Sequence, residues 1–315
     1  ASECVMLRSL DELIGIHKYI KAQSCSYFIL GGGSNVLLPD RFDGLVLLSQ
    51  TKGIDILSEP SQDTIRLRVM AGEQWDNFVA LSLDNGWFGL ENLSLIPGTV
   101  GAAPIQNIGA YGVEVKDFIE CVECFDLNTG QFLTLYKEEC AFSYRSSRFK
   151  TEPHLLVIAV VFCLSKVQNL NLSYGDIAGK MALISNPKAS DLRHCIIETR
   201  QSKLPDPQIV PNVGSFFHNP VLIHRVVEQL QRQYPKLPVY FVDENCSKVS
   251  AGWLIDNLGL KGYQYKNVGI YEKQALVFVN YGASSRSELL ELAHIIQDKV
   301  FTQYRIELPI EPILI

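Results

Sequence analysis

Concentrated basic charge and long apolar runs are both missing from this 315-residue sequence. Lysine and arginine number 28 against 34 aspartate and glutamate residues, the formal net charge at pH 7 is -6, and the cations are spread along the chain. This argues against a nucleic-acid-binding protein, which would gather its cations on one surface. The longest wholly apolar run, residues 155–164, is too short to cross a bilayer and predicts a buried strand.

Cysteine is too sparse for a disulfide framework, with eight residues in the whole chain. Cys121 and Cys124 form a lone C-x-x-C pair without the two further ligands that a zinc site needs, so no metal is expected. The pair is typical of a strand entering a turn at residues 128–130. The N-terminus has no signal-peptide pattern, which together with the cysteine usage predicts a cytoplasmic protein. The first residue is not Met, so we expect the natural start upstream.

The length and the 47% hydrophobic content predict two or three domains with substantial cores. The first half is strand-rich: Ile65, Leu67 and Val69 alternate with arginines, as in a half-buried strand. Two prolines at residues 204–207 indicate a domain boundary. Beyond them, Asn219 and the proline after it are typical of a helix N-cap and first turn. Residues 285–288 predict a capping box that opens a long helix.

The most informative segment is residues 94–112, which holds four glycines and two prolines yet almost no charge. A flexible linker would be more polar, so we expect a buried, tightly shaped loop with a large ligand against its main chain. Residues 28–38 form its counterpart, an apolar strand that enters a glycine turn suited to phosphate. Alone, this turn is as consistent with a purely structural role, since it lacks the G-x-G-x-x-G pattern. The two segments together favour a ligand site.

Three polar positions are candidates for chemistry. Arg145 lies in a basic, aromatic segment in which Arg148 and Lys150 are typical of a solvated turn. Ser215 precedes two phenylalanines and His218, but the G-x-S-x-G elbow and a matching acid are both missing, so a cap or turn residue is favoured over a hydrolase nucleophile. Glu311 stands in an apolar tail, where an unpaired carboxylate is costly.

Taken in order, these segments resemble the MurB family of UDP-N-acetylenolpyruvoylglucosamine reductases, type I, which are flavoenzymes of bacterial cell-wall synthesis. The resemblance covers nearly the whole chain and rests on GGGSNVLL, the glycine-rich segment 94–112, FSYRSSRF, KLPDP, GSFFHNP, KVSAGWLID and the acidic tail. It implies an α+β fold with an FAD-binding pair of subdomains of the vanillyl-alcohol oxidase/PCMH type and a smaller C-terminal substrate domain. The implied domains are residues 1–50, 51–203 and 204–306, with a tail 307–315 that returns to the active site.

The resemblance also implies site residues. FAD would be held by Gly31, Gly32, Gly33, Ser34, Asn35, Ile96, Pro97, Gly98, Gly101, Ala102, Ile105 and Gly109. Ser215 would protonate the substrate carbon, while Arg145 and Glu311 would stabilise the enolate-like intermediate. The substrate site would be lined by Tyr111, Tyr144, Tyr174, Lys203, Asn219, Tyr240, Lys248 and Gln274, with Tyr174 on a mobile loop.

The implied reaction reduces UDP-N-acetylglucosamine-enolpyruvate to UDP-N-acetylmuramate, with NADPH as reductant, hydride from flavin N5 and a proton from Ser215. The implied protein is a cytoplasmic monomer without nucleic-acid or membrane partners. Two alternatives stay open: another FAD-dependent oxidoreductase on this fold, and a non-catalytic nucleotide-sugar-binding module. The chain departs from the family pattern in three places. It lacks the usual Asn-Thr-Phe-Gly start, His218 stands where lysine is common, and Tyr271 stands where histidine is common.

Overall fold

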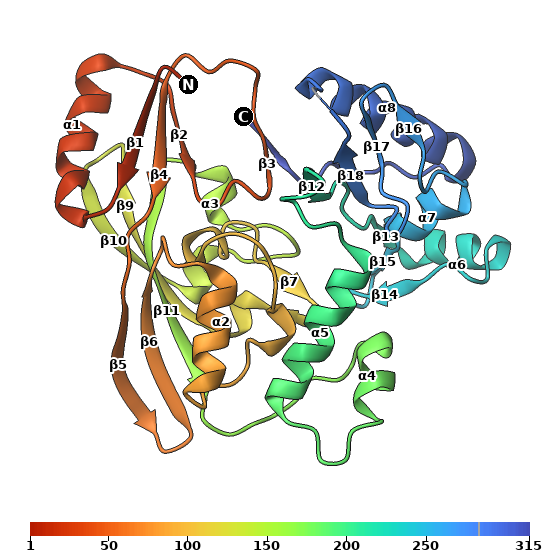
Figure 1. Cartoon of the computed structure of the whole chain (residues 1–315), viewed down its shortest axis with the longest axis horizontal. Coiled ribbons are helices and arrows are strands. Elements are labelled where there is room, and N and C mark those ends of the chain that lie inside the picture. The colour runs from red at the N-terminus through yellow and green to blue at the C-terminus, as the bar shows by residue number, and fades with distance from the viewer. Residues whose placement is uncertain (283) are drawn as a thin grey trace. The chain divides into compact units, whose positions relative to one another are not determined.

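The computed structural model describes residues 1–282 and 284–315, which divide into two compact units. The N-terminal unit comprises Ala1–Ser34 and Arg41–Arg200, and the C-terminal unit comprises Asn35–Asp40 and Gln201–Ile315. Both units combine helices with sheets, as the α+β prediction requires (Figure 1). Among the described residues, we find no helix that has both the length and the apolar character needed to cross a membrane.

A small parallel sheet opens the N-terminal unit. Its central strand β4 (Leu45–Ser49) pairs with β1 (Glu3–Leu7) on one side and β2 (Tyr27–Leu30) on the other. Helix α1 (Leu13–Gln23) lies beside this sheet (Figure 1) and turns its apolar face toward it. The glycine turn therefore follows directly on a strand, β2, as the sequence predicts.

A larger antiparallel sheet forms the main core of this unit, in the order β10-β9-β11-β6-β5. Its strands are β5 (Ile54–Ser61), β6 (Thr64–Met70), β9 (Ile119–Asp126), β10 (Gln131–Tyr136) and β11 (Leu155–Ser165). The apolar run therefore forms the central strand, as predicted, and the alternating side chains of β6 point into the core. Helix α2 (Trp75–Asp84) packs against the sheet through its aromatic residues.

Shorter elements complete the unit. They are β7 (Gly109–Ala110), β8 (Val113–Glu114), α3 (Arg148–Thr151), α4 (Gly175–Met181) and α5 (Ala189–Lys203), whose residues from Gln201 onward belong to the C-terminal unit. Single turns of 3-10 helix occur at Leu10–Glu12, Glu91–Leu93, Val100–Ala102, Val115–Asp117 and Lys137–Cys140. These elements leave the glycine-rich segment largely irregular, so its shape depends on side-chain and main-chain contacts with its neighbours.

The C-terminal unit contains two antiparallel sheets. The first, in the order β12-β18-β17-β16, consists of β12 (Asn212–Ser215), β18 (Val277–Asn280), β17 (Val268–Ile270) and β16 (Gln264–Tyr265). The second, in the order β13-β15-β14, consists of β13 (Val221–Ile223), β15 (Cys246–Val249) and β14 (Val239–Phe241). The helices are α6 (His224–Gln233), α7 (Ala251–Asn257) and α8 (Arg286–Tyr304). The last strand, β19 (Ile313–Leu314), pairs in parallel with β3 (Val36–Leu37).

Helix α8 begins as the sequence predicts. The Ser285 hydroxyl accepts the N–H of Glu288 over 3.4 Å, which is the serine half of the expected capping box. The side chains predicted to face inward are all buried: Leu289, Leu292, Ala293, Ile296 and Val300. The core beneath them contains Phe216 stacked on Phe278, with ring centroids 4.2 Å apart.

The predicted helix start at Asn219 is wrong. Residues after it form strand β13, and α6 begins only at His224, after an extended N-cap residue. The Asn219 side chain does cap a helix, but a distant one: its Oδ1 accepts the N–H of Ala251, the first residue of α7. The prediction that the Asn219 side chain caps a helix is therefore correct, but the helix is a different one, which begins 32 residues away in sequence.

Candidate functional site

The two glycine-rich segments meet in the N-terminal unit. A methyl group placed on Gly32 would lie 2.8 Å from the Cα of Gly98, which is closer than real Cβ atoms approach. The Ser34 hydroxyl donates to the Pro97 carbonyl oxygen over 3.2 Å, which ties the two segments together. Only residues without a side chain permit this approach, so glycine is required at Gly32 for the backbone of both segments to face one ligand.

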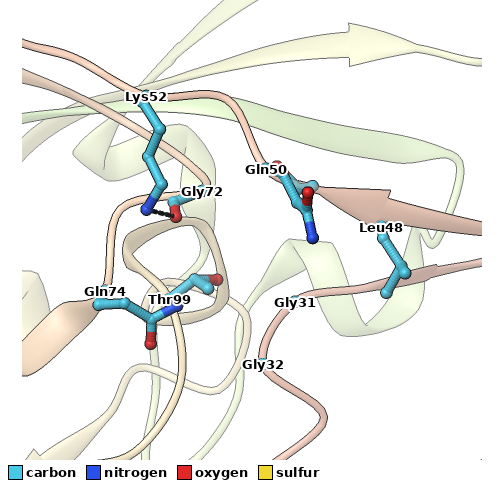
Figure 2. A pocket seen from close by; sticks show the side chains of 9 residues that line it. Gly31, Gly32, Leu48, Gln50, Lys52, Gly72, Gln74 and Thr99 are labelled. Atoms are coloured by element: carbon cyan, nitrogen blue, oxygen red, sulfur yellow. Dashed lines mark hydrogen bonds between the residues drawn. The ribbon is translucent and has the colours of Figure 1, made fainter. Parts of the chain in front are cut away.

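A hollow of about 350 Å³ lies beside this contact. Figure 2 shows Gly31 and Gly32 as bare backbone on one side, Gln74 and Thr99 on the other, and Lys52 reaching the Gly72 carbonyl oxygen. Thr99 belongs to the predicted glycine-rich segment, but no sequence motif marks the other residues that line this hollow: Leu48, Ser49, Gln50, Lys52, Gly72 and Gln74. The fold brings them to the glycines from two other parts of the chain, residues 48–52 and 72–74.

Two hydroxyls at this hollow are buried without a protein partner. Within the described residues, Ser49 Oγ and Thr99 Oγ1 make no hydrogen bond. A buried hydroxyl without a partner is costly, so such groups point to an absent ligand. Together with the glycine backbone and the Lys52 ammonium, they suit a large ligand with phosphate and hydroxyl groups.

The glycine-rich loop is anchored by a carboxylate. Asp76 accepts two hydrogen bonds from Arg193, at 2.7 and 2.9 Å, and a third from the backbone N–H of Leu95 over 2.5 Å. Burial alone would raise the pKa of Asp76, but these bonds outweigh it and hold the pKa below its usual value. Leu95 has a left-handed backbone, with φ +59°, so the carboxylate stabilises a conformation that leucine rarely adopts.

Arg145 is held in a strained turn. Its φ is +53°, its guanidinium donates to the Gly109 carbonyl oxygen over 2.6 Å, and it lies 5.5 Å from the Tyr144 ring centroid. Lys150 is half-buried and donates to the Arg145 carbonyl oxygen over 3.2 Å, so the expectation that it is merely solvated is wrong. A strained backbone conformation persists only where surrounding contacts hold it in place, and such positions cluster at functional sites.

Arg200 is a second arginine near Arg145, and the sequence analysis missed it. Burial lowers the pKa of its guanidinium, while a hydrogen bond and the electrostatic interaction with Tyr111 raise it. Arg200 Nε is buried and has no hydrogen-bond partner among the described residues. A helical arginine carries no motif, so only its burial in the fold distinguishes it.

The segment before α4 is attached to the end of the glycine-rich loop. Asn92 Nδ2 donates to the carbonyl oxygens of Tyr111 and Asn171, each over 2.9 Å. The Tyr174 ring packs edge-on against Tyr111, with centroids 5.3 Å apart, and remains 37% exposed. Tyr174 therefore lies over Tyr111 at the N-cap position of α4.

In the C-terminal unit, the chain terminus runs alongside the segment that contains Ser215. Ser215 ends strand β12 with an exposed side chain, so it is neither a helix cap nor at the start of a helix. The next residue, Phe216, accepts the N–H of Glu311 over 2.9 Å, and Phe217 forms a bridge with Ile310. The fold thus places the Glu311 backbone one residue from Ser215 across a strand pair. Arg145 belongs to the other unit.

Two of the predicted substrate residues are cross-strand neighbours: Tyr240 on β14 pairs in register with Lys248 on β15. Asn219 precedes the third strand of that sheet. Gln274 lies in the loop before β18, where its Oε1 accepts the Leu276 N–H over 3.5 Å. Lys203 is half-buried at the end of α5.

The C-x-x-C pair lies on β9, which enters the turn to β10, so the strand interpretation is confirmed. Burial raises the pKa of Cys121 to about 11, and it raises the pKa of Cys140, on a neighbouring turn, to about 12. Such thiols are protonated and unreactive at neutral pH.

Family models match both parts of the chain. Residues 2–136 match an FAD binding domain, and residues 206–315 match the C-terminal domain of UDP-N-acetylenolpyruvoylglucosamine reductase. The close backbone approach of Gly32 and Gly98, the unpartnered hydroxyls of Ser49 and Thr99, and Lys52 fit the phosphates and hydroxyls of FAD. The class is therefore that of a flavoprotein with a second, C-terminal domain.

Curated relatives identify the family. UDP-N-acetylenolpyruvoylglucosamine reductase of Polynucleobacter asymbioticus is 44% identical over 97% of this chain and 89% of its own length. That of Neisseria gonorrhoeae is 43% identical over 98% of this chain and 90% of its own. The chain belongs to the family of UDP-N-acetylenolpyruvoylglucosamine reductases. The solved Thermus caldophilus MurB has the same fold, with a TM-score of 0.68, 24% identity and coverage of 99% of this chain and 91% of that one.

Proposed function

We propose that this chain reduces UDP-N-acetylglucosamine-enolpyruvate to UDP-N-acetylmuramate, with FAD as cofactor and NADPH as reductant. The observation that carries the proposal beyond family membership is the pairing of the Glu311 tail with the segment that starts at Ser215. This pairing brings the Glu311 backbone within one residue of Ser215, and the proposed reaction uses the hydroxyl of one residue and the carboxyl of the other.

When bound, FAD supplies the hydride, from flavin N5, that is added to the vinyl carbon of the substrate. Residues 31–35 and 96–109 of the chain would hold it, with Ser49 and Lys52 added to the predicted set because they line the hollow. The close approach at Gly32 leaves main-chain N–H groups available for the phosphates.

Ser215 would deliver a proton to the substrate carbon next to the carboxylate. Its side chain is exposed at the end of β12, so a substrate can reach the hydroxyl. A serine hydroxyl is a weak acid, and it serves here because the developing carbanion is strongly basic and adjacent. Arg145 would offset the negative charge that spreads into the substrate carboxylate.

Glu311 would support the same charge only if its carboxyl carries a proton or a hydrogen bond, since a bare carboxylate would repel it. The Glu311 side chain is largely buried, with 12% of its surface exposed. Tyr111, Tyr144, Tyr174, Lys203, Asn219, Tyr240, Lys248 and Gln274 would bind the nucleotide sugar.

We propose the same domain roles as the resemblance implies: FAD binding by residues 1–50 and 51–203, substrate binding by 204–306, and a catalytic tail in 307–315. We also propose a cytoplasmic monomer. The supporting observation for the location is that the cysteines of the described residues are free thiols, which suit a reducing compartment.

The flavin absorption spectrum of the purified protein tests the proposed function. We expect a flavin spectrum, release of the chromophore on acid precipitation, bleaching by NADPH, and recovery of colour when the enolpyruvyl substrate is added without oxygen. Rapid recovery with oxygen but none with the substrate would indicate another oxidoreductase of this fold. Binding of UDP-sugars without a flavin would indicate a non-catalytic module.

A further inference from the structure

His218 contacts the carboxyl group of Glu311. Its Nδ1 lies 3.4 Å from Glu311 Oε2, and the two side chains are only 17% and 12% exposed. The distance is longer than that of an ordinary N–H···O bond, but contacts in ligand-free sites are often long and shorten when the substrate binds. Both groups are polar and largely buried, so each side chain benefits from a polar neighbour.

The backbone fixes this contact. The His218 N–H donates to the Pro309 carbonyl oxygen, and the Glu311 N–H donates to the Phe216 carbonyl oxygen, each over 2.9 Å. In an antiparallel pair with this register, the side chains of residues 218 and 311 lie on the same face as diagonal neighbours, within reach of long side chains. Phe216 and Phe217, between these bonds, are buried in the core of the unit, so the framework is rigid.

We propose that His218 is a positioning residue for Glu311: its Nδ1 shares one hydrogen bond with the Glu311 carboxyl and so fixes the carboxyl group toward the substrate. This inference rests on the proposed function, in which Glu311 supports the developing negative charge. A carboxyl group has two equivalent oxygens and rotates freely about its last bond. A partner at Oε2 therefore selects one orientation and leaves the other oxygen for the substrate.

In the arrangement that the proposed function needs, His218 donates its Nδ1–H to Oε2, and the other oxygen, Oε1, carries the proton that faces the substrate. One hydrogen bond from a neutral donor then orients Glu311, so an uncharged side chain with an N–H donor at the Nδ1 position should replace histidine. This separates positioning from a purely ionic role.

Two polar substitutions test the proposal. Asparagine places its amide close to the position of Nδ1, whereas glutamine places it close to that of Nε2, away from Glu311. We expect His218→Gln to slow the oxidation of NADPH-reduced enzyme by the enolpyruvyl substrate about tenfold or more, the loss of one hydrogen bond to an ionisable group. His218→Asn should stay within a few-fold of the parent protein. In both variants, flavin reduction by NADPH should be unchanged.

A second background isolates the route through Glu311. In Glu311→Gln protein, His218→Gln should cause no further slowing of the substrate step, because the carboxyl it positions is gone. His294→Gln, on the exposed side of α8, is the matched control and should leave both steps unchanged. The thermal unfolding midpoint of each variant separates a change in folding from a change in rate.

Three results would overturn the proposal: a His218→Gln protein as fast as the parent, equal slowing in His218→Gln and His218→Asn, or undiminished slowing in the Glu311→Gln background. Failure of the proposed function has a different signature. In that case the parent protein itself would not be reoxidised by the enolpyruvyl substrate, whatever residue stands at 218.

Discussion

Arg145 Nη2 donates to the Gly109 carbonyl oxygen over 2.6 Å, which joins the turn that contains Arg145 to the end of the glycine-rich segment 94–112. A methyl group on Gly109 would lie 2.9 Å from Arg145 Nη1, so the loop is shaped closely around the guanidinium. The orientation of Arg145 therefore depends on the same loop that we propose holds FAD.

Replacing Arg145 with glutamine should affect the substrate step far more than cofactor binding. Loss of a preorganised cationic donor at a developing negative charge costs about 10²–10³-fold in rate. Stopped-flow absorbance of the reduced enzyme mixed with substrate measures this, and the flavin content of the purified variant checks cofactor binding. Arg148→Gln is the matched control: it removes an i,i+4 ion pair with Glu152 worth about 0.3–0.5 kcal/mol and should leave the rate unchanged. Equal slowing in the two variants would contradict the role of Arg145.

Gly32→Ala should reduce FAD affinity because the added methyl group would collide with the Gly98 backbone. Equilibrium dialysis of the flavin measures the effect. Gly15→Ala is the control, since Gly15 lies on the exposed face of helix α1 with nothing within 4 Å of an added Cβ. That change should stabilise the protein by about 0.5–1 kcal/mol and leave FAD affinity unchanged. Unaltered flavin binding in Gly32→Ala would show that the close approach of the two segments is not needed.

Asp76→Asn should destabilise the N-terminal unit in a pH-dependent way. Hydrogen bonds to a charged group contribute about 1.5–3 kcal/mol, and asparagine loses this charge. Because the folded-state pKa of Asp76 is below its usual value, the contribution is present above the unfolded-state pKa and is lost as pH falls through the folded-state pKa. Urea unfolding at neutral and acidic pH should show a gap between variant and parent that closes in acid. A gap of the same size at both pH values would exclude the ionised carboxylate as its source.

Tyr174→Phe tests whether the segment before α4 serves the substrate. We expect weaker binding of the UDP-substrate to oxidised enzyme, by about 0.5–1.5 kcal/mol for one lost hydrogen bond, with NADPH reduction of the flavin intact. Titration followed by the flavin spectrum gives the dissociation constant. Tyr19→Phe, which removes a similarly exposed hydroxyl from Glu3, is the control. An unchanged constant in Tyr174→Phe would leave only its packing on Tyr111 as a role.

Sequence patterns predict the elements whose formation depends on residues close together in the chain. The apolar run became β11, Ser285 caps α8, and β2 runs into the glycine turn. Each of these follows from side-chain periodicity or backbone freedom within a few residues, which a single sequence displays directly.

Long-range contacts account for what the sequence analysis missed. Asn219 caps a helix that begins 32 residues further along the chain. The pKa of Arg200 is altered only because the folded chain buries it near Tyr111. Lys52 donates a hydrogen bond to the carbonyl oxygen of Gly72, 20 residues away. The residues next to these three in the sequence form no recognisable motif. The significance of these three arises only after the chain has brought separate segments together, which is why the sequence predicts the glycine-rich segments of the candidate cofactor site but not Ser49 or Lys52.

Ser215→Ala gives the most direct test of the central claim, that this chain protonates a substrate carbon after flavin-dependent hydride transfer. Both half-reactions are followed by stopped-flow absorbance in one variant. We expect the reduction of the flavin by NADPH to keep the parent rate, while reoxidation by the enolpyruvyl substrate falls about 10²–10⁴-fold, the usual cost of losing a positioned general acid. Equal slowing of both half-reactions, or a substrate step as fast as in the parent protein, would contradict it.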